Sequence, residues 1–137
     1  MSTLRALLLL LCLLMGPPLA GCTADDSTAR GTAEAFLDDH YVRIQLTDAL
    51  AHTTDLARQK VEKEIELARD SAIDGETAKP HVSYTQKLAR EDAQRATFEY
   101  ELLIRPEGME PFRRLVLVVL KPAGDVWRVT NFSEKTD

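Results

Sequence analysis

The sequence predicts one α+β domain, in which N-terminal helices pack on a curved four-stranded antiparallel sheet. Up to Arg69, apolar residues recur every three or four positions, which is typical of amphipathic helices. From Val82 onward they alternate with polar residues, which is typical of half-buried strands joined by short loops. Removing a leader of 21 residues from the 137 leaves 116 residues, the length of one domain.

The first residues, 1–21, predict a signal peptide. Arg5 supplies a positive charge, and an unbroken apolar run of ten residues extends from Ala6 to Met15. Ten helical residues rise only about 15 Å, half of a ~30 Å bilayer core, so the run is too short to span a membrane. Pro17 and Pro18 end the helix and leave an extended backbone that a peptidase can cleave.

Leu19-Ala20-Gly21-Cys22 resembles the lipobox of bacterial lipoproteins, in which the cysteine is acylated before the leader is removed. The resemblance implies lipidation of Cys22 by palmitate-like chains, which hold a protein stably at a membrane when two or more are attached. Thr23 is not the aspartate that favours inner-membrane retention in that family, so it implies the outer membrane, facing the periplasm, in a Gram-negative host. The alternative is ordinary secretory cleavage that leaves a free thiol.

Residues 22–31 are small, polar and without periodicity, and predict a flexible tether before a domain over residues 32–137. The stripe of Ala33, Phe36, Leu37, Tyr41 and Ile44 predicts a first helix over about 32–45. A short helical turn is expected over 49–51, and a longer helix from Asp55 to about Arg69. Its charged pairs at four-residue spacing are typical of a solvated face.

Residues 71–80 contain turn formers, and four strands are expected over 82–88, 96–104, 114–121 and 126–132. Short connections make these strands an antiparallel meander. Two sets share the inward face: Val82, Tyr84, Gln86 and Leu88 on the first strand, and Ala96, Phe98, Tyr100, Leu102 and Ile104 on the second.

The third strand is apolar on both faces. Leu115, Leu117 and Val119 are expected to face the helices, which assigns to the outer face a candidate interface made of Leu103, Val116, Val118 and Leu120. Something should cover such a face, either a second copy in a homodimer or an envelope protein partner. The alternative is shielding by the long stems of Arg113, Arg128 and Lys87.

The order of the elements, closed by Asp125-Val126-Trp127-Arg128-Val129, resembles the nuclear transport factor 2-like, or cystatin-like, roll. The resemblance implies a pocket between the helices and the concave sheet face. Four aromatic residues are its candidate lining: Tyr41, Tyr84, Tyr100 and Trp127. The alternative is that these side chains fill the core while their polar tips reach hydrogen-bond partners.

Catalysis is the alternative function, by a small-molecule isomerase or hydratase that uses the roll pocket. Members of this fold family that resemble ketosteroid isomerase need a carboxylate base inside the pocket. The inward positions offer Gln86 but no carboxylate, because Glu99 and Glu101 have outward parity. His40 is interpreted as a boundary histidine of the first helix, with an acid–base role as the alternative. We therefore assign no catalytic residue.

Composition narrows the partners further. The mature part carries 16 positive and 22 negative charges, and this acidic balance disfavours nucleic acid. His40, His52 and His81 lack metal-ligand spacing, so no metal or cofactor is expected. The leading hypothesis is a lipid-anchored envelope protein that acts as a non-catalytic binding or assembly module. A small-molecule ligand would be of unknown identity, and a purely structural envelope role is a further alternative.

Overall fold

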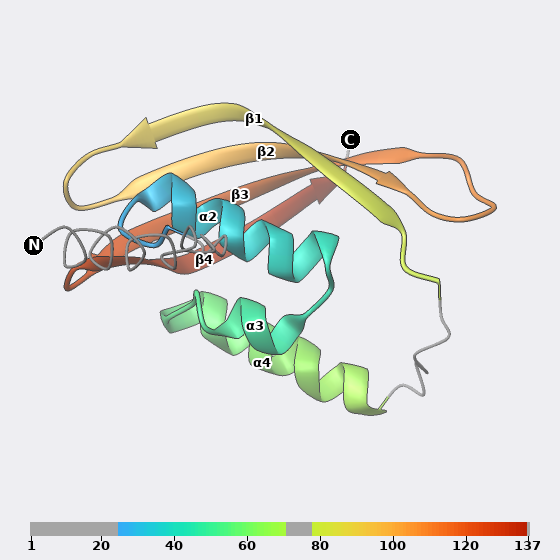
Figure 1. Cartoon of the computed structure of the whole chain (residues 1–137), viewed down its shortest axis with the longest axis horizontal. Helices are drawn as coiled ribbons and strands as arrows, with labels where there is room; N and C mark the ends of the chain where they lie inside the picture. The colour runs from blue at the N-terminus through green and yellow to red at the C-terminus, as the bar shows by residue number, and fades with distance from the viewer. Residues whose placement is uncertain (1–24, 71–77, 137) are drawn as a thin grey trace, which may run out of the picture.

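The computed structural model describes residues 25–70 and 78–136, and within them helices pack against one four-stranded antiparallel sheet (Figure 1). This architecture confirms the predicted α+β class. The predicted signal peptide, Cys22 and most of the predicted turn over 71–80 lie outside the described residues. The elements are α2 (Ala29–Leu37), η1 (Asp38–Val42), α3 (Leu46–Leu50), α4 (Asp55–Asp70), β1 (His81–Glu91), β2 (Ala96–Arg105), β3 (Phe112–Ala123) and β4 (Val126–Thr136).

Helix α2 begins at Ala29, three residues before the predicted start. Thr28 is extended, and its Oγ1 accepts a hydrogen bond from the Gly31 backbone N–H at 3.0 Å. This cap satisfies one of the backbone donors that a helix leaves free in its first turn.

In the part of the chain that the structure describes, no helix is long and apolar enough to cross a membrane.

The predicted tether over residues 22–31 is wrong for residues 25–31, which belong to the folded domain. The Trp127 backbone N–H donates to the carbonyl of Asp26 at 2.9 Å, and so joins the segment before α2 to the start of β4. Small polar residues are typical of a linker when only the local sequence is considered. In the structure, the Asp26 carbonyl has a hydrogen-bond partner on β4, about a hundred residues further along the chain.

The first predicted helix, over residues 32–45, is divided in the structure. After Leu37 it widens into the π-helical turn η1, in which the Arg43 N–H bonds to the carbonyl of Asp38, five residues back, at 2.7 Å. The chain then leaves the helix at Ile44, whose φ is +53°. This conformation is strained for a β-branched residue. Single π-turns within helices frequently occur at functional sites.

The sheet has the order β1-β2-β3-β4, so the predicted meander is correct. A bulge between Gln86 and Leu88 interrupts the pairing of β1 with β2. The extra residue reverses the alternation, and Leu88 therefore lies opposite Glu99 and not on the inner face as predicted. Leu88 is exposed.

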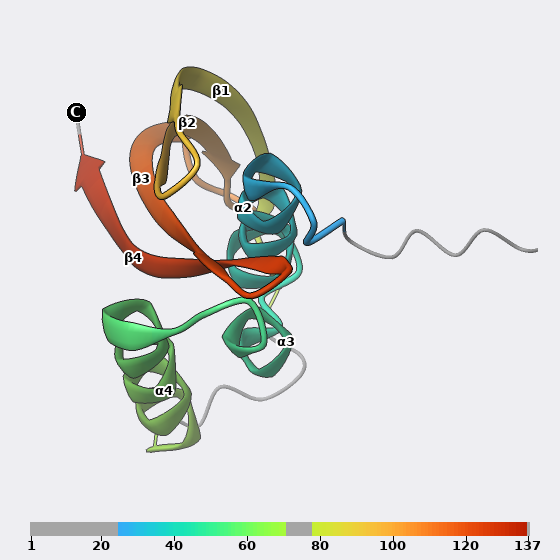
Figure 2. The ribbon, with the colours of Figure 1, turned by 90° about the vertical axis from the view of Figure 1, so that its left-hand side faces the viewer.

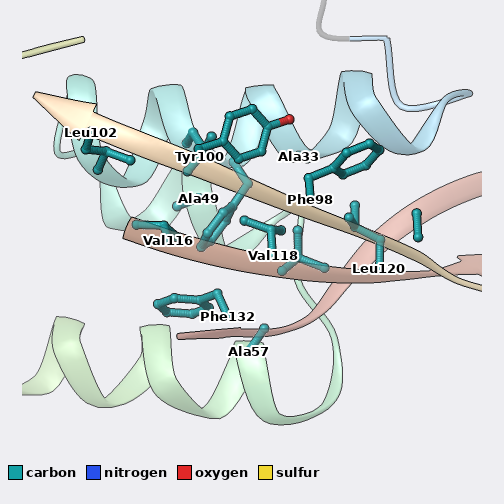
Figure 3. Close-up of a cluster of buried hydrophobic side chains, with 14 of the residues drawn as sticks. Ala33, Ala49, Ala57, Phe98, Tyr100, Leu102, Val116, Val118, Leu120 and Phe132 are labelled. Atoms are coloured by element: carbon teal, nitrogen blue, oxygen red, sulfur yellow. The ribbon is translucent and has the colours of Figure 1, made fainter. Parts of the chain in front are cut away.

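On β3 the predicted assignment of faces is reversed. Val116, Val118 and Leu120 are fully buried and contribute to the core that Figure 3 shows, so they are not available as an outer interface. They lie opposite inward-facing residues of β2, with Tyr100 opposite Val116 and Phe98 opposite Val118. Directly opposed residues of antiparallel strands point to the same face, so the pairing with β2 decides the parity.

The outer face of β3 consequently carries the other set, Leu115, Leu117 and Val119, which are half-buried. Leu103 of β2 also lies on this face and is half-buried, so its neighbours there are not the predicted Val116, Val118 and Leu120. We call these four residues the outer apolar row.

The core lies between the concave sheet face and the helices. The sheet curls around α2, while α4 packs mainly against β4 (Figure 2). Phe36 of α2 contacts Phe132 of β4, with ring centroids 5.0 Å apart. Helix α4 has fewer buried residues than α2, and only Ala57 and Val61 of its residues are buried.

Candidate functional site

The π-turn η1 presents four consecutive polar side chains, Asp38 to Tyr41, and each reaches a different element. The Tyr84 hydroxyl of β1 donates to Asp38 Oδ1 at 2.9 Å. Asp39 is buried and pairs with His52 Nε2 at 2.9 Å, in the segment after α3. Its other oxygen accepts from Arg43 Nε at 3.0 Å, which compensates the burial of the carboxylate.

The next two residues connect η1 to α4 and β4. His40 Nε2 lies 2.6 Å from Glu64 Oε2, and the Tyr41 hydroxyl donates to Glu134 Oε1 at 2.8 Å. Glu134 Oε2 in turn accepts from Arg114 at 2.8 Å. A π-turn makes this fan of contacts possible, because its wider turn changes the direction in which successive side chains leave the helix.

His40 is enclosed by rings and is only 8% exposed. Its ring centroid lies 5.2 Å from that of Phe36, 5.1 Å from that of Phe132 and 4.3 Å from that of Tyr41. His40 Nδ1 is buried and has no hydrogen-bond partner among the described residues. Nε2 is the nitrogen that can donate to the Glu64 carboxylate, whereas a proton on Nδ1 would be a buried donor without a partner.

A cavity of about 370 Å³ adjoins η1 at the end of the sheet where β1 and β3 begin and β2 ends. Apolar side chains make up most of its wall, and His40, Tyr41, Glu64 and Arg114 are its polar members. We call it the η1 pocket. Its lining residues are His40, Tyr41, Ile44, Leu46, Glu64, Pro80, Val82, Ile104, Phe112 and Arg114.

The polar members of the wall are held in place by neighbours. The Arg114 guanidinium lies 5.7 Å from the centroid of the Phe112 ring, and its Nε is buried without a hydrogen-bond partner in the described part of the chain. Burial, with the Glu134 carboxylate, raises the pKa of Tyr41 far above its ordinary value of 10. Tyr41 therefore stays protonated at physiological pH and donates its hydroxyl hydrogen to Glu134.

The four aromatic residues predicted to share a pocket are separated in the structure. Tyr41 lines the η1 pocket, whereas Tyr84, Tyr100 and Trp127 do not line it. Tyr84 and Tyr100 pack edge to face with centroids 5.6 Å apart, and Trp127 lies at the opposite end of the sheet, beside Asp26. The alternative, that such rings fill the core, describes Tyr84 and Tyr100 better.

The two inner tyrosines differ in their hydroxyl groups. The hydroxyl of Tyr84 has Asp38 as its acceptor, while that of Tyr100 is buried without a partner among the described residues. Burial raises the pKa of both above the ordinary value; the hydrogen bond to Asp38 adds to the rise for Tyr84, and nearby Glu34 adds to it for Tyr100.

No sequence pattern predicted that His40, Glu64, Arg114 and Ile44 share a pocket. Glu64 was interpreted as part of a solvated helix face, yet it is the partner of His40. One signal was available, since Asp38, Asp39, His40 and Tyr41 place four polar side chains in succession where an amphipathic helix should bury part of its surface. Within residues 25–70 and 78–136, no group of three or more His, Cys, Asp or Glu side chains could hold a metal ion.

Comparison with known proteins gives the class of the fold. Neither a protein-family model nor a curated protein matches the chain. A solved structure described as a calcium/calmodulin-dependent protein kinase type II association domain, from Thiobacillus denitrificans, is similar with a TM-score of 0.62 and 14% identity, over 80% of this chain and 94% of that one.

Two further solved structures agree. An NTF2 variant that carries several substitutions gives a TM-score of 0.56 and 14% identity, over 80% of this chain and 97% of that one. A protein of unknown function with a cystatin-like fold, from Nostoc punctiforme, gives 0.55 and 12% identity, over 79% of this chain and 87% of that one. The chain therefore has the NTF2-like, cystatin-like fold that the element order predicts, and this likeness is one of fold alone.

Proposed function

We propose that the mature chain is a lipid-anchored protein of the bacterial cell envelope that binds a small, largely apolar ligand in the η1 pocket without converting it. The observation that carries the proposal is the cavity of about 370 Å³, with an apolar wall, next to the π-turn η1 and the strained Ile44 that follows it. This volume falls in the range of about 300–1,000 Å³ that is usual for ligand pockets.

The wall of the η1 pocket suits an amphiphilic molecule. Six of its ten described lining residues are apolar: Ile44, Leu46, Pro80, Val82, Ile104 and Phe112. These would cover an alkyl or ring system, while the guanidinium N–H groups that Arg114 does not use on Glu134 offer donors to one polar group. Strain of the kind found at Ile44 is concentrated at ligand clamps and other functional sites.

Binding is favoured over catalysis because the ionisable groups of the wall are already occupied. Glu64 is paired with His40, and the remaining nitrogen of His40, Nδ1, is buried. A general base must come within hydrogen-bond reach of the proton that it removes. An isomerase or hydratase would therefore require His40 to turn out of its ring contacts.

The anchoring part of the proposal rests on the lipobox-like Leu19-Ala20-Gly21-Cys22. Mass spectrometry of the native protein is expected to find residues 1–21 absent and Cys22 acylated. Substitution Cys22→Ser is expected to release the protein from membranes. An unacylated amino terminus in native material would refute lipid anchoring and leave the pocket proposal standing.

The pocket part is tested by calorimetric titration of the purified domain with decanoate and decanol, an acidic and a neutral amphiphile. Leu46→Trp fills the η1 pocket and is expected to weaken binding at least tenfold. Leu56→Trp is the matched control, because Leu56 is an exposed residue of α4 outside the lining. Equal binding by both variants, or no binding by the wild type, would contradict the proposal. Chemical alteration of the recovered ligand would favour the enzyme.

Self-association is a second candidate role, and the outer apolar row is the observation that favours it. Leu103, Leu115, Leu117 and Val119 are only half-buried by their own chain. One similar solved structure is named an association domain, which is a statement about that protein. Sedimentation velocity would decide, since Leu117→Lys should dissociate a dimer formed through this face, and a wild type that sediments as a monomer removes the candidate.

A further inference from the structure

The segment nearest to Cys22 is joined to one particular end of the sheet. Asp26 accepts from the Trp127 backbone N–H at 2.9 Å, and its carboxylate lies 3.4 Å from Arg128 of the same strand. Trp127 is opposite Pro122 in the β3–β4 pairing, one pair away from the turn between these strands. The described chain therefore starts beside the β3–β4 turn.

The β1–β2 turn lies at the same end. Glu91 is opposite Ala96, and Ala96 is opposite Leu120 of β3, close to the β3–β4 turn. We call this end, with both turns and Asp26, the hairpin end; both turns appear together at the left of Figure 1.

The η1 pocket is at the other end of the sheet. Its lining residues Val82, Ile104 and Phe112 belong to the start of β1, the end of β2 and the start of β3. Between Phe112 and Lys121, β3 advances nine residues, which corresponds to about 30 Å of strand. The loop between β2 and β3, at the right of Figure 1, marks this distal end.

Covalent geometry limits how far the hairpin end can move from an acylated Cys22. Only three residue steps separate Cys22 from Asp25, and even a fully extended chain covers roughly 10 Å in that length. This reach is about a third of the span from Phe112 to Lys121, so the link cannot carry the distal end around to the anchor.

We propose that the hairpin end rests against the phospholipid headgroups and that the η1 pocket opens away from the anchoring membrane. This orientation depends on the proposed acylation of Cys22. A ligand then enters from the aqueous compartment or from a partner beyond it, and is not drawn directly from the leaflet that holds the anchor.

The native protein contains its own reporter, because Trp127 is its single tryptophan and lies half-buried at the hairpin end. The acylated chain is reconstituted in phosphatidylcholine vesicles that contain a headgroup nitroxide quencher. We expect Trp127 fluorescence to be quenched at least twofold more than that of a reporter moved to the distal end, in the double variant Trp127→Phe and Phe112→Trp. Equal quenching, or stronger quenching at the distal end, would overturn the orientation.

Link length provides an independent control. Insertion of 12 Gly and Ser residues between Ala24 and Asp25 adds a flexible chain with a mean reach of about 20 Å, and should reduce the quenching of Trp127. An unchanged signal would mean that surface contacts, and not the short link, orient the domain.

Failure of acylation is distinguished from failure of the orientation. If mass spectrometry finds no acyl group, the mature chain beginning at Cys22 has this residue as its sole thiol, since Cys12 lies in the leader. Coupling it to a maleimide phospholipid recreates the same link. The quenching comparison then tests the geometry, while the missing acyl group counts only against the proposed anchoring.

Discussion

The rings of Tyr84 and Tyr100 pack against each other, but only one of the two hydroxyl groups has a hydrogen-bond partner among the described residues. Tyr100 is 0% exposed with an unpaired hydroxyl among the described residues, whereas the hydroxyl of Tyr84 donates to a carboxylate. A buried polar group without a partner is unfavourable by about 1–3 kcal/mol, and a hydrogen bond to a charged group contributes a similar amount.

Tyr100→Phe is therefore expected to leave the free energy of unfolding unchanged or to raise it by about 1 kcal/mol. Tyr84→Phe removes the bond to Asp38 and is expected to lower it by about 1–2 kcal/mol. Urea denaturation of both variants checks the pair. A larger loss for Tyr100→Phe than for Tyr84→Phe would mean that the Tyr100 hydroxyl has an acceptor, such as a bound water.

Ile44 combines backbone strain with a place in the η1 pocket. Its φ of +53° is a region that asparagine tolerates and β-branched residues avoid, and its side chain is 40% exposed. Ile44→Asn should therefore raise the free energy of unfolding by about 1 kcal/mol while it weakens binding of decanol. Ile44→Val retains the β-branch and should show no gain, and a destabilised Ile44→Asn would contradict the strain argument.

At the scale of elements, α4 depends on a few polar contacts for its attachment. Lys60 Nζ donates to the Phe132 carbonyl at 2.6 Å and to Asn131 Oδ1 at 2.9 Å, and it lies 5.3 Å from the centroid of the Phe132 ring. These contacts fix α4 to β4 beside Ala57 and Val61, which it buries in the core.

Lys60→Met should lower the free energy of unfolding by about 1–3 kcal/mol, because it leaves the Phe132 carbonyl without this partner. Lys63→Met is the matched control on the same helix, since Lys63 pairs with exposed Glu66 and such surface pairs contribute less than about 1 kcal/mol. Amide hydrogen exchange should show the loss of protection mainly in α4. Similar effects of the two substitutions would contradict the assigned role of Lys60.

The elements were predictable where a local rule governs them. Alternating residues and short loops predicted the meander, and three- and four-residue spacing predicted that α2 and α4 are helices, although not the bounds of α2. On β3 both faces are apolar, so the choice between Val116 and Leu117 as the inward residue depends on pairing with another strand. The bulge between Gln86 and Leu88 could not be predicted either, because no residue pattern in β1 indicates it.

The site was less predictable than the fold, for the same reason. Tyr41 followed from the helical stripe, but the partnership of His40 with Glu64 joins residues 24 positions apart on separate helices. The π-turn that redirects η1 is a departure from the regular helical period, and a pattern search that assumes that period misses it.

At the scale of the whole molecule, three tyrosines are expected to make the free energy of unfolding fall at alkaline pH. Burial is the first cause that raises the pKa of Tyr41, Tyr84 and Tyr100 above the value of about 10 that they have when unfolded. Their stabilising contribution is fully present below that pH, and it is lost as the pH rises from 10 toward the folded pKa values, because the unfolded chain releases these protons first.

The free energy of unfolding should therefore be insensitive to tyrosine ionisation at pH 8 and fall above pH 10, by up to about 1.4 kcal/mol per pH unit for each tyrosine. Urea titrations across this range, with tyrosinate absorbance recorded in parallel, measure both quantities. Tyr84→Phe should reduce the slope, and tyrosinate absorbance that rises before unfolding would contradict the assignment of these groups as buried.

The contact between Asp26 and β4 also determines the order in which the molecule can assemble. Each strand pairs with its neighbour in sequence, so the hairpins can zip together as the chain emerges, yet Asp26 and Arg128 are 102 positions apart. The contact between Phe36 and Phe132 likewise cannot form until β4 has been synthesised. Helix α2 is thus synthesised long before the strand that fixes it, and a polypeptide truncated before β4 should expose α2 to proteases.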